Sequence, residues 1–128
     1  MKITNTILID DDPILRFSIK KMITDNIKET LFTSFACGYD ALDYIKSIHL
    51  HDSTRILILL DVHMPLLNGW GFLKEFKEKM KGMEHKFSIH MISSTKELGE
   101  KKELLAHKLV NSFISKPITM KELNKLFV

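Results

Sequence analysis

Acidic side chains follow two aliphatic runs in this chain. Three consecutive aspartates, Asp10, Asp11 and Asp12, come directly after residues 6–9, and Asp61 follows five consecutive aliphatic residues. A short aliphatic run that ends in turn residues is typical of a strand buried on both faces, as in parallel sheets. Because open α/β sheets bind their ligands at the carboxyl ends of the strands, we expect these carboxylates at one rim. Taken alone, Asp61 is equally consistent with a turn, and Asp12 is better explained as a helix N-cap.

Hydroxyl and ammonium groups end two later strands. Ser93 and Ser94 close one aliphatic segment, and Lys116 follows another. Several carboxylates at one place raise one another's pKa unless a cation holds them, and Mg²⁺ or Mn²⁺ is the hard, oxygen-binding ion that suits them. An aspartate held by such an ion can attack phosphorus, with Lys116 and Ser93 binding the other phosphoryl oxygens. Singly, Lys116 is more typical of a surface lysine, so the prediction of a phosphoryl-transfer site depends on the shared position.

The hydrophobic pattern predicts the elements that carry these residues. Pro13 suits the first position of a helix, and Thr119 and Glu122 have the spacing of a capping box, as do Ser94 and Glu97. Alternating strands and helices predict a doubly wound α/β domain, a five-stranded parallel sheet with five helices on its two faces. The predicted strands are 6–9, 29–35, 55–60, 87–93 and 112–115, and the predicted helices are 13–26, the segment that follows Gly38 and includes Ile48, 69–81, 95–108 and the segment from 119 onward.

Composition limits the class of protein. A chain of 128 residues is the size of one domain, which we expect to span 1–128, and 45% hydrophobic and 27% charged residues are ordinary for a globular protein. The net charge of +3 is too small to predict nucleic-acid binding. Cys37 is the single cysteine, which favours a reducing compartment, and no apolar stretch has the ~20 residues of a membrane span. We therefore expect a cytoplasmic protein without a membrane segment or signal peptide.

The motifs together resemble the receiver domain of two-component response regulators, in particular the stand-alone, chemotaxis-regulator-like members. The resemblance covers the whole chain, with the motifs in the family's order and spacing. It implies a flavodoxin-like sheet with strand order 2-1-3-4-5. The matching segments are I-L-I-D-D-D-P at 7–13, A-C-G-Y-D-A-L at 36–42, L-L-D-V-H-M-P-L-L-N-G at 59–69, M-I-S-S at 91–94 and F-I-S-K-P-I at 113–118.

The resemblance implies an acceptor and a metal site. In this family a histidine kinase or a histidine phosphotransfer protein passes a phosphoryl group to an aspartate, which here would be Asp61. Asp10, Asp11 and Asp61 would be the metal carboxylates, with Asp11 a direct ligand and Asp10 acting largely through water. His63 would give its backbone carbonyl to the metal, and its unusual side chain is expected to overhang the acceptor. The protein would be a regulator that assists its own phosphorylation and dephosphorylation rather than an enzyme.

The resemblance also implies a switch. Ser93 would be the switch hydroxyl, with Ser94 beside it, Lys116 the phosphoryl-sensing lysine and Phe113, in place of the frequent tyrosine, the switch aromatic. The Lys116–Pro117 bond is cis in such domains. Phosphorylation would draw Ser93 toward the phosphoryl group and let Phe113 turn inward. The surface of the fourth helix, fifth strand and fifth helix would then change for a downstream target protein.

Other interpretations stay open at this stage. A haloacid-dehalogenase-type phosphatase would use the D-x-D at Asp10 and Asp12 but would leave Asp61 without a role. A flavin-binding domain is disfavoured because three aspartates repel phosphate. A degenerate receiver would act only as a docking module. His90, inside a predicted strand, is more consistent with a satisfied histidine than with a ligand, and His49 and His51 lack the further ligands that zinc requires.

Overall fold

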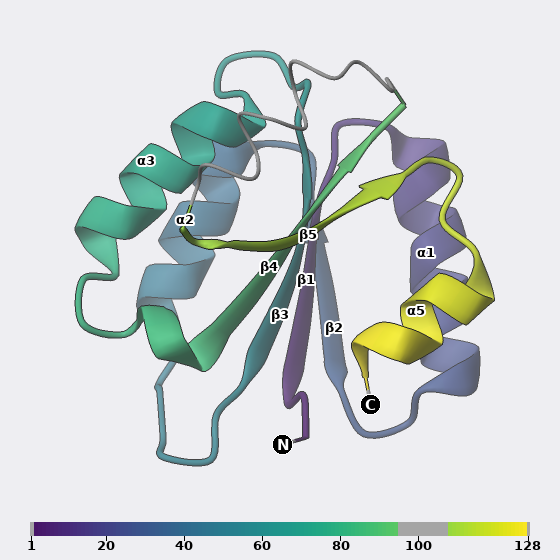
Figure 1. Ribbon diagram of the computed structural model, residues 1–128, viewed down its shortest axis with the longest axis horizontal. Helices are drawn as coiled ribbons and strands as arrows, with labels where there is room; N and C mark the ends of the chain where they lie inside the picture. The colour runs from purple at the N-terminus through teal and green to yellow at the C-terminus, as the bar shows by residue number, and fades with distance from the viewer. Residues whose placement is uncertain (1, 95–107, 128) are drawn as a thin grey trace.

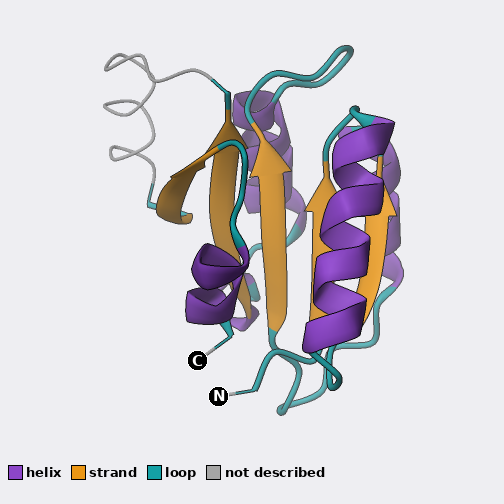
Figure 2. Cartoon of the chain, turned by 90° about the vertical axis from the view of Figure 1, so that its right-hand side faces the viewer, coloured by secondary structure: helices purple, strands orange, loops and turns teal. Residues whose placement is uncertain are grey.

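The sheet is five-stranded and parallel, with the predicted order β2-β1-β3-β4-β5. The structure is a computed structural model that describes residues 2–94 and 108–127. All strands point toward one end of the sheet (Figure 2), so their carboxyl ends form a common rim. The strands are β1 (Asn5–Ile9), β2 (Leu31–Phe35), β3 (Ile56–Asp61), β4 (Phe87–Ser93) and β5 (Val110–Ser115).

Helices cover both faces of the sheet. One face carries α2 and α3, and the other carries α1 and α5 (Figure 1). This arrangement is the predicted doubly wound architecture, and it divides the core into one cluster on each face. The helices are α1 (Pro13–Asn26), α2 (Gly38–Ser47), α3 (Gly69–Lys79), α5 (Met120–Leu126) and the short 3₁₀ helix η1 (Glu84–Lys86).

The aliphatic runs are the central strands. Every residue of β3 is buried, and the last four residues of β1 are fully enclosed. Burying one such aliphatic side chain contributes about 1.5–3 kcal/mol. The strands that carry Asp10 and Asp61 are therefore the best-packed part of the sheet, and they hold these two residues on a rigid support.

Several helices and strands begin or end where the sequence predicts. Asp12 is the N-cap of α1, where its side chain accepts a hydrogen bond from the Ile14 amide at 2.9 Å. Thr119 and Glu122 form both hydrogen bonds of the predicted capping box of α5. The ranges predicted for α1 and β4 match the structure, and the Lys116–Pro117 peptide is cis.

Other predicted ends were wrong by a few residues. β2 begins at Leu31 rather than residue 29, because pairing with β1 starts where the Leu31 amide donates to Thr4. β3 runs through Asp61, α3 ends at Lys79, and β5 begins at Val110, two residues early. The helix predicted at 95–108, and with it the Ser94–Glu97 capping box, lies outside the described residues except for Ser94 and Lys108.

Candidate functional site

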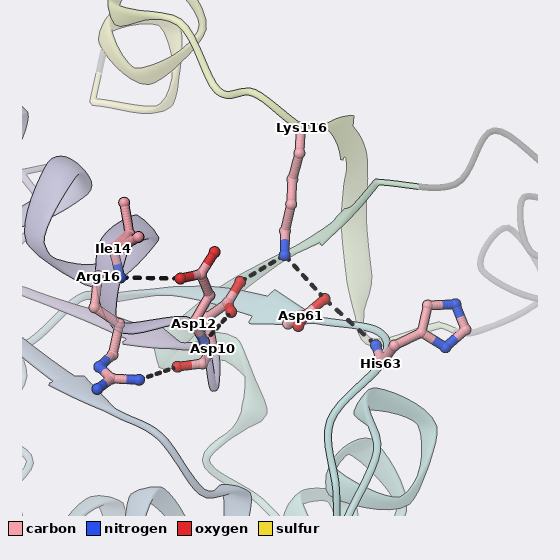
Figure 3. Close-up of polar contacts among 7 residues, drawn as sticks. All are labelled: Asp10, Asp12, Ile14, Arg16, Asp61, His63 and Lys116. Carbon is pink, nitrogen blue, oxygen red and sulfur yellow. Dashed lines mark hydrogen bonds and ion pairs between the residues drawn. The ribbon is translucent and has the colours of Figure 1, made fainter.

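Three charged side chains converge at the rim of the sheet (Figure 3). Asp10 directly follows β1, Asp61 is the last residue of β3, and Lys116 directly follows β5. The Nζ of Lys116 lies 2.8 Å from Oδ2 of Asp10 and 3.4 Å from Oδ1 of Asp61. Residues that are distant in the sequence therefore form one compact charged cluster.

Asp10 is held from several sides. Its side chain is completely buried, and Oδ1 accepts a hydrogen bond from the Asp12 amide at 2.9 Å. Its own amide donates to the Phe35 carbonyl on β2 at 3.0 Å. Its carbonyl accepts a hydrogen bond from Nη1 of Arg16 at 2.8 Å (Figure 3). Both the backbone and the carboxylate of Asp10 are thus fixed in place.

Arg16 is a site residue that the sequence interpretation missed. Helical periodicity predicts the outward face of α1 for this residue, but the side chain is half-buried and turns back over the first turn of the helix to reach Asp10. An arginine four residues after an N-cap aspartate can reach back in this way, because its side chain is longer than one helical turn. That spacing, Asp12 to Arg16, was the available signal.

Asp61 is a buried carboxylate with incomplete charge compensation. It is 4% exposed, and its Oδ1 accepts one long hydrogen bond of 3.4 Å from the His63 amide. Burial, reinforced by the charge of Asp10, raises the pKa of Asp61 to about 6 in spite of Lys116. Burial alone would lower the pKa of Lys116, but its contacts with Asp10 and Asp61 outweigh this effect and raise it.

The carboxylates fit a hard divalent cation. Asp10, Asp11 and Asp61 each offer an oxygen, and these oxygens lie within 4.8 Å of one another. Oδ2 of Asp10 is enclosed and accepts no hydrogen bond of good geometry from the described residues beyond its ion pair with Lys116. Asp11 is exposed, which leaves the group open to solvent on one side. An all-oxygen set of this kind suits Mg²⁺ or Mn²⁺ and is unsuited to softer metals.

The remaining predicted site residues lie on the same end of β3, β4 and β5. Ser93 is fully buried at the end of β4, whereas Ser94 is exposed. The amide of Lys116 donates to the carbonyl of Ser93 at 2.9 Å. Phe113 is half-buried and packs against the core cluster under α2 and α3. The His63 ring is exposed and points away from Asp61, so the expected overhang of the acceptor is not seen (Figure 3).

The other histidines that the structure describes do not add a metal site. His90 is satisfied inside the sheet, as predicted, by a hydrogen bond between its Nδ1 and the Ser112 hydroxyl, and burial lowers its pKa to about 4. The rings of His49 and His51 contact each other in a tilted arrangement, with centroids 4.5 Å apart. Within residues 2–94 and 108–127, the only group of three or more metal-binding side chains is the aspartate group.

Comparison with known proteins gives a consistent picture. The sequence model of the response regulator receiver domain matches residues 6–127. A two-component response regulator from Cytophaga hutchinsonii has a similar structure, with a TM-score of 0.88 and 28% identity over 99% of this chain and 96% of that one. A response regulator receiver protein from Dyadobacter fermentans has a TM-score of 0.85 and 24% identity over 96% and 94% of the two chains.

One curated relative is a longer protein. The protein-glutamate methylesterase/protein-glutamine glutaminase 2 of Saccharophagus degradans is 30% identical over 118 residues, which are 91% of this chain. The match spans 31% of that relative's length. None of the helices in the described part of the chain has the length and apolar character needed to cross a membrane.

Proposed function

Since the chain belongs to the response regulator receiver domain family, we propose that it accepts a phosphoryl group on Asp61 from a phosphohistidine and changes a protein-binding surface in response. The donor is a histidine kinase or a histidine phosphotransfer protein. Residues 1–128 act as a single receiver domain in the cytoplasm. The methylesterase and glutaminase activities in the relative's name are not proposed for this chain, which spans under a third of that protein.

One observation supports this proposal above the others. Two buried carboxylates, Asp10 and Asp61, share the ammonium of Lys116 at distances of 2.8 and 3.4 Å. A purely structural ion pair requires one carboxylate, whereas here burial, with the charge of Asp10 added to it, raises the pKa of Asp61 to about 6. Charges that a protein retains at such cost are typical of a functional site.

Asp10, Asp11 and Asp61 would hold the metal. The backbone carbonyl of His63 would be a further oxygen ligand, Asp11 would be the direct ligand from the first loop, and Asp10 would act largely through water. When bound, Mg²⁺ supplies positive charge that neutralises oxygens of the transferring phosphoryl group. The protein's part is to hold the oxygen ligands together and to keep one Asp61 oxygen available.

The transfer is a displacement at phosphorus. A free carboxylate oxygen of Asp61 attacks, an O–P bond forms, and the N–P bond to the donor histidine breaks. The imidazole nitrogen keeps the electron pair of that bond and takes a proton from water. Lys116 binds a phosphoryl oxygen, with the hydroxyl of Ser93 and the neighbouring Ser94 on the other side of the group.

The switch uses the ends of β4 and β5. Phosphorylation draws Ser93 toward the new phosphoryl oxygens, and Phe113 turns into the space that Ser93 leaves. The two states differ in the surface near β5 and α5, where a downstream target binds. A ligand or modification shifts such an equilibrium only by its differential contacts with the two states, and here those contacts are the ones that Ser93 and Lys116 make to the phosphoryl group.

The donor docks beside the acceptor on α1. Ile14 and Phe17 are 78% and 70% exposed, an unusual state for large apolar side chains on a helix that begins next to Asp10. Apolar side chains on one exposed helix face suit a helical donor domain that brings its phosphohistidine over the rim.

Acetyl phosphate labelling with and without Mg²⁺ tests the function. We expect a mass increase of one phosphoryl group only with Mg²⁺, localised to Asp61, and none in Asp61→Asn. Steady hydrolysis of a phosphomonoester with Asp61→Asn still active would instead favour a phosphatase that uses Asp10 and Asp12. A folded protein that takes no label under any condition would favour a docking module.

A further inference from the structure

The pairing of β5 with β4 contains one extra residue. Ile89 pairs with Val110, but the next residue of β4, His90, pairs with Ser112, so Asn111 has no partner in β4. The pairing is regular from there to Ser93 and Ser115. This irregularity is a β-bulge, a feature that is rare between parallel strands and that re-aims side chains near functional sites.

The bulge changes which face of the sheet the later residues of β5 occupy. In a regular strand, residues three apart point to opposite faces. Val110 and Phe113 are three apart, yet both pack against the core cluster under α2 and α3. Ile114 packs against the cluster on the other face. The extra residue therefore brings Phe113 to the face that it would not occupy in an uninterrupted strand.

The new register aligns Phe113 with the proposed switch serine. Phe113 pairs with Met91 of β4, and Met91 belongs to the same core cluster as Ile89. Ser93 lies two residues beyond Met91, so strand alternation places it on that same face. The proposed switch pair, Ser93 and Phe113, thus shares a face only because of the bulge.

Two side-chain hydrogen bonds hold the bulge in place. The Ile89 amide donates to Oδ1 of Asn111 at 2.9 Å. One residue further along, Nδ1 of His90 and the hydroxyl of Ser112 form a hydrogen bond between the two strands. These contacts come immediately before and after the irregularity, and both link β4 to β5.

The end of β5 carries the site lysine. After the last strand pair, Ser93 and Ser115, the Lys116 amide donates to the Ser93 carbonyl, and the side chain reaches Asp10 and Asp61. A slip of β5 by one residue would move Lys116 by the ~3.3 Å rise of a parallel strand. A displacement of that size would take Lys116 out of ion-pair distance of Asp10 and Asp61.

We propose that Asn111, together with the His90–Ser112 hydrogen bond, is a positioning device that sets the register of β5 for phosphoryl transfer and switching. It fixes Phe113 on the face of Ser93 and holds Lys116 at the carboxylates. This inference rests on the proposed function, because it assigns the bulge a role at that site. It acts through Lys116 and Phe113 and makes no contact with the phosphoryl group itself.

The test compares Asn111→Ala/Ser112→Ala with the conservative pair Asn111→Asp/Ser112→Thr, which keeps an acceptor oxygen and a hydroxyl. Acetyl phosphate labelling of Asp61 is measured at saturating Mg²⁺, and Mg²⁺ affinity is measured by the fluorescence of Trp70, the single tryptophan. Moving the ammonium of Lys116 away from Asp10 and Asp61 would remove a competing positive charge from the metal carboxylates, so Mg²⁺ affinity should not fall. Labelling should fall about tenfold or more, since a misplacement of 1 Å can cost that much, and the conservative pair should restore it.

A structural readout separates this inference from the proposed function. In the alanine pair, the Ile89 amide should exchange faster with solvent, and the nuclear Overhauser contacts between Phe113 and Met91 should weaken. Unchanged labelling, or labelling and Mg²⁺ affinity that fall together with the folded fraction, would overturn the positioning role. If the unaltered protein takes no label, the proposed function fails, and the Phe113–Met91 contacts still decide whether these residues set the register. Should the double variant not fold, Asn111→Ala alone is compared with Asn111→Asp.

Discussion

The ammonium group of Lys116 is held by Asp10, whose buried Oδ2 lies 2.8 Å from Nζ. The distance from the same nitrogen to Asp61, the proposed acceptor, is longer at 3.4 Å. In this state Asp10 is therefore the principal partner of the lysine. A phosphoryl group on Asp61 would add negative charge and compete with Asp10 for Lys116, which gives the lysine two discrete sets of partners.

Lys116→Met should raise the pKa of Asp61 above its present value of about 6. The lysine opposes the burial of Asp61 and the repulsion from Asp10, and methionine fills similar space without the charge. A carbon-13 NMR titration of the Asp61 carboxyl in metal-free protein measures the change. Lys121→Met, at an exposed position on α5, is the matched control and should leave the titration unaltered. An unshifted Asp61 titration in Lys116→Met would contradict the ion-pair geometry.

Ionised Asp61 should destabilise the metal-free fold. Its pKa is raised from 3.8 to about 6 by burial and then by Asp10, so the folded state binds the proton more tightly than the unfolded state. The contribution of this group to the free energy of unfolding therefore falls as the pH rises from about 4 to about 6, and stays low above that range. Asp61→Asn should stabilise the protein by about 1–3 kcal/mol at pH 7 and by much less at pH 4.

Urea unfolding in EDTA at both pH values measures this difference. Asp43→Asn, an exposed aspartate on α2, controls for the loss of a negative charge. Equal changes in the free energy of unfolding at pH 4 and pH 7 in Asp61→Asn would mean that the surroundings of Asp61 do not disfavour its ionised form.

Mg²⁺ affinity should fall by about tenfold between pH 7 and pH 5, because the metal competes with the proton that Asp61 binds with a pKa of about 6. Isothermal titration calorimetry measures the affinity, and proton release on binding should be small at pH 7.5 and should increase steadily as the pH falls through 6 toward 5. Asp61→Asn should bind Mg²⁺ more weakly and lose most of this pH dependence. An affinity that is flat over this range in the unaltered protein would exclude Asp61 from the ligand set.

Much of the fold followed from local patterns, and the site's convergence followed from the topology. Short aliphatic runs ending in aspartate predicted β1 and β3, because strands buried on both faces need no alternation. Because the strand ends of a parallel sheet share one rim, the topology places Asp10, Asp61 and Lys116 together there. The structure brings them within ion-pair distance. Their roles in phosphoryl transfer stay predictions.

The features that sequence patterns missed depend on side-chain conformation and strand register. Helical periodicity predicts that Arg16 faces outward, and only the conformation of its side chain brings the guanidinium back to the Asp10 carbonyl. The bulge at Asn111 made β5 start two residues before the predicted strand, since an extra residue interrupts the alternation on which strand prediction relies. The orientation of the His63 ring likewise could not follow from its position beside Asp61.

Arg16→Gln should weaken Mg²⁺ binding about tenfold or more, as expected when a group that orients a metal ligand is removed. The guanidinium donates to the Asp10 carbonyl at 2.8 Å and so fixes the loop that carries Asp10 and Asp11. The sign of the change is informative, because removing a positive charge would by itself strengthen cation binding. The Mg²⁺ affinity of Arg16→Lys should lie between that of the unaltered protein and that of Arg16→Gln. Tighter Mg²⁺ binding in Arg16→Gln, measured by Trp70 fluorescence, would show that Arg16 acts only through its charge.

Gly69→Ala should damage the acceptor strand far more than Gly71→Ala, although both glycines lie in the first turn of α3. A Cβ at position 69 would lie 2.7 Å from the backbone oxygen of Asp61 and 2.6 Å from Cε of Met91. The Gly69 amide also donates to the Val62 carbonyl at 2.8 Å, so the helix cannot withdraw without losing this hydrogen bond. Overpacking of this kind costs about 1–3 kcal/mol.

In the control, Gly71→Ala, the new methyl group meets a side chain that can move. A Cβ at position 71 would approach only the end of the Leu67 side chain closely, at 2.7 Å, and that group can rotate aside. Alanine is also the better helix former by up to ~1 kcal/mol, so Gly71→Ala should be near neutral. Urea unfolding gives the stabilities, and the amide NMR shifts of Asp61 and Val62 report the strand. Equal stabilities with unmoved Asp61 and Val62 signals would show that the backbone next to the acceptor can yield, contrary to the close contact between α3 and the end of β3.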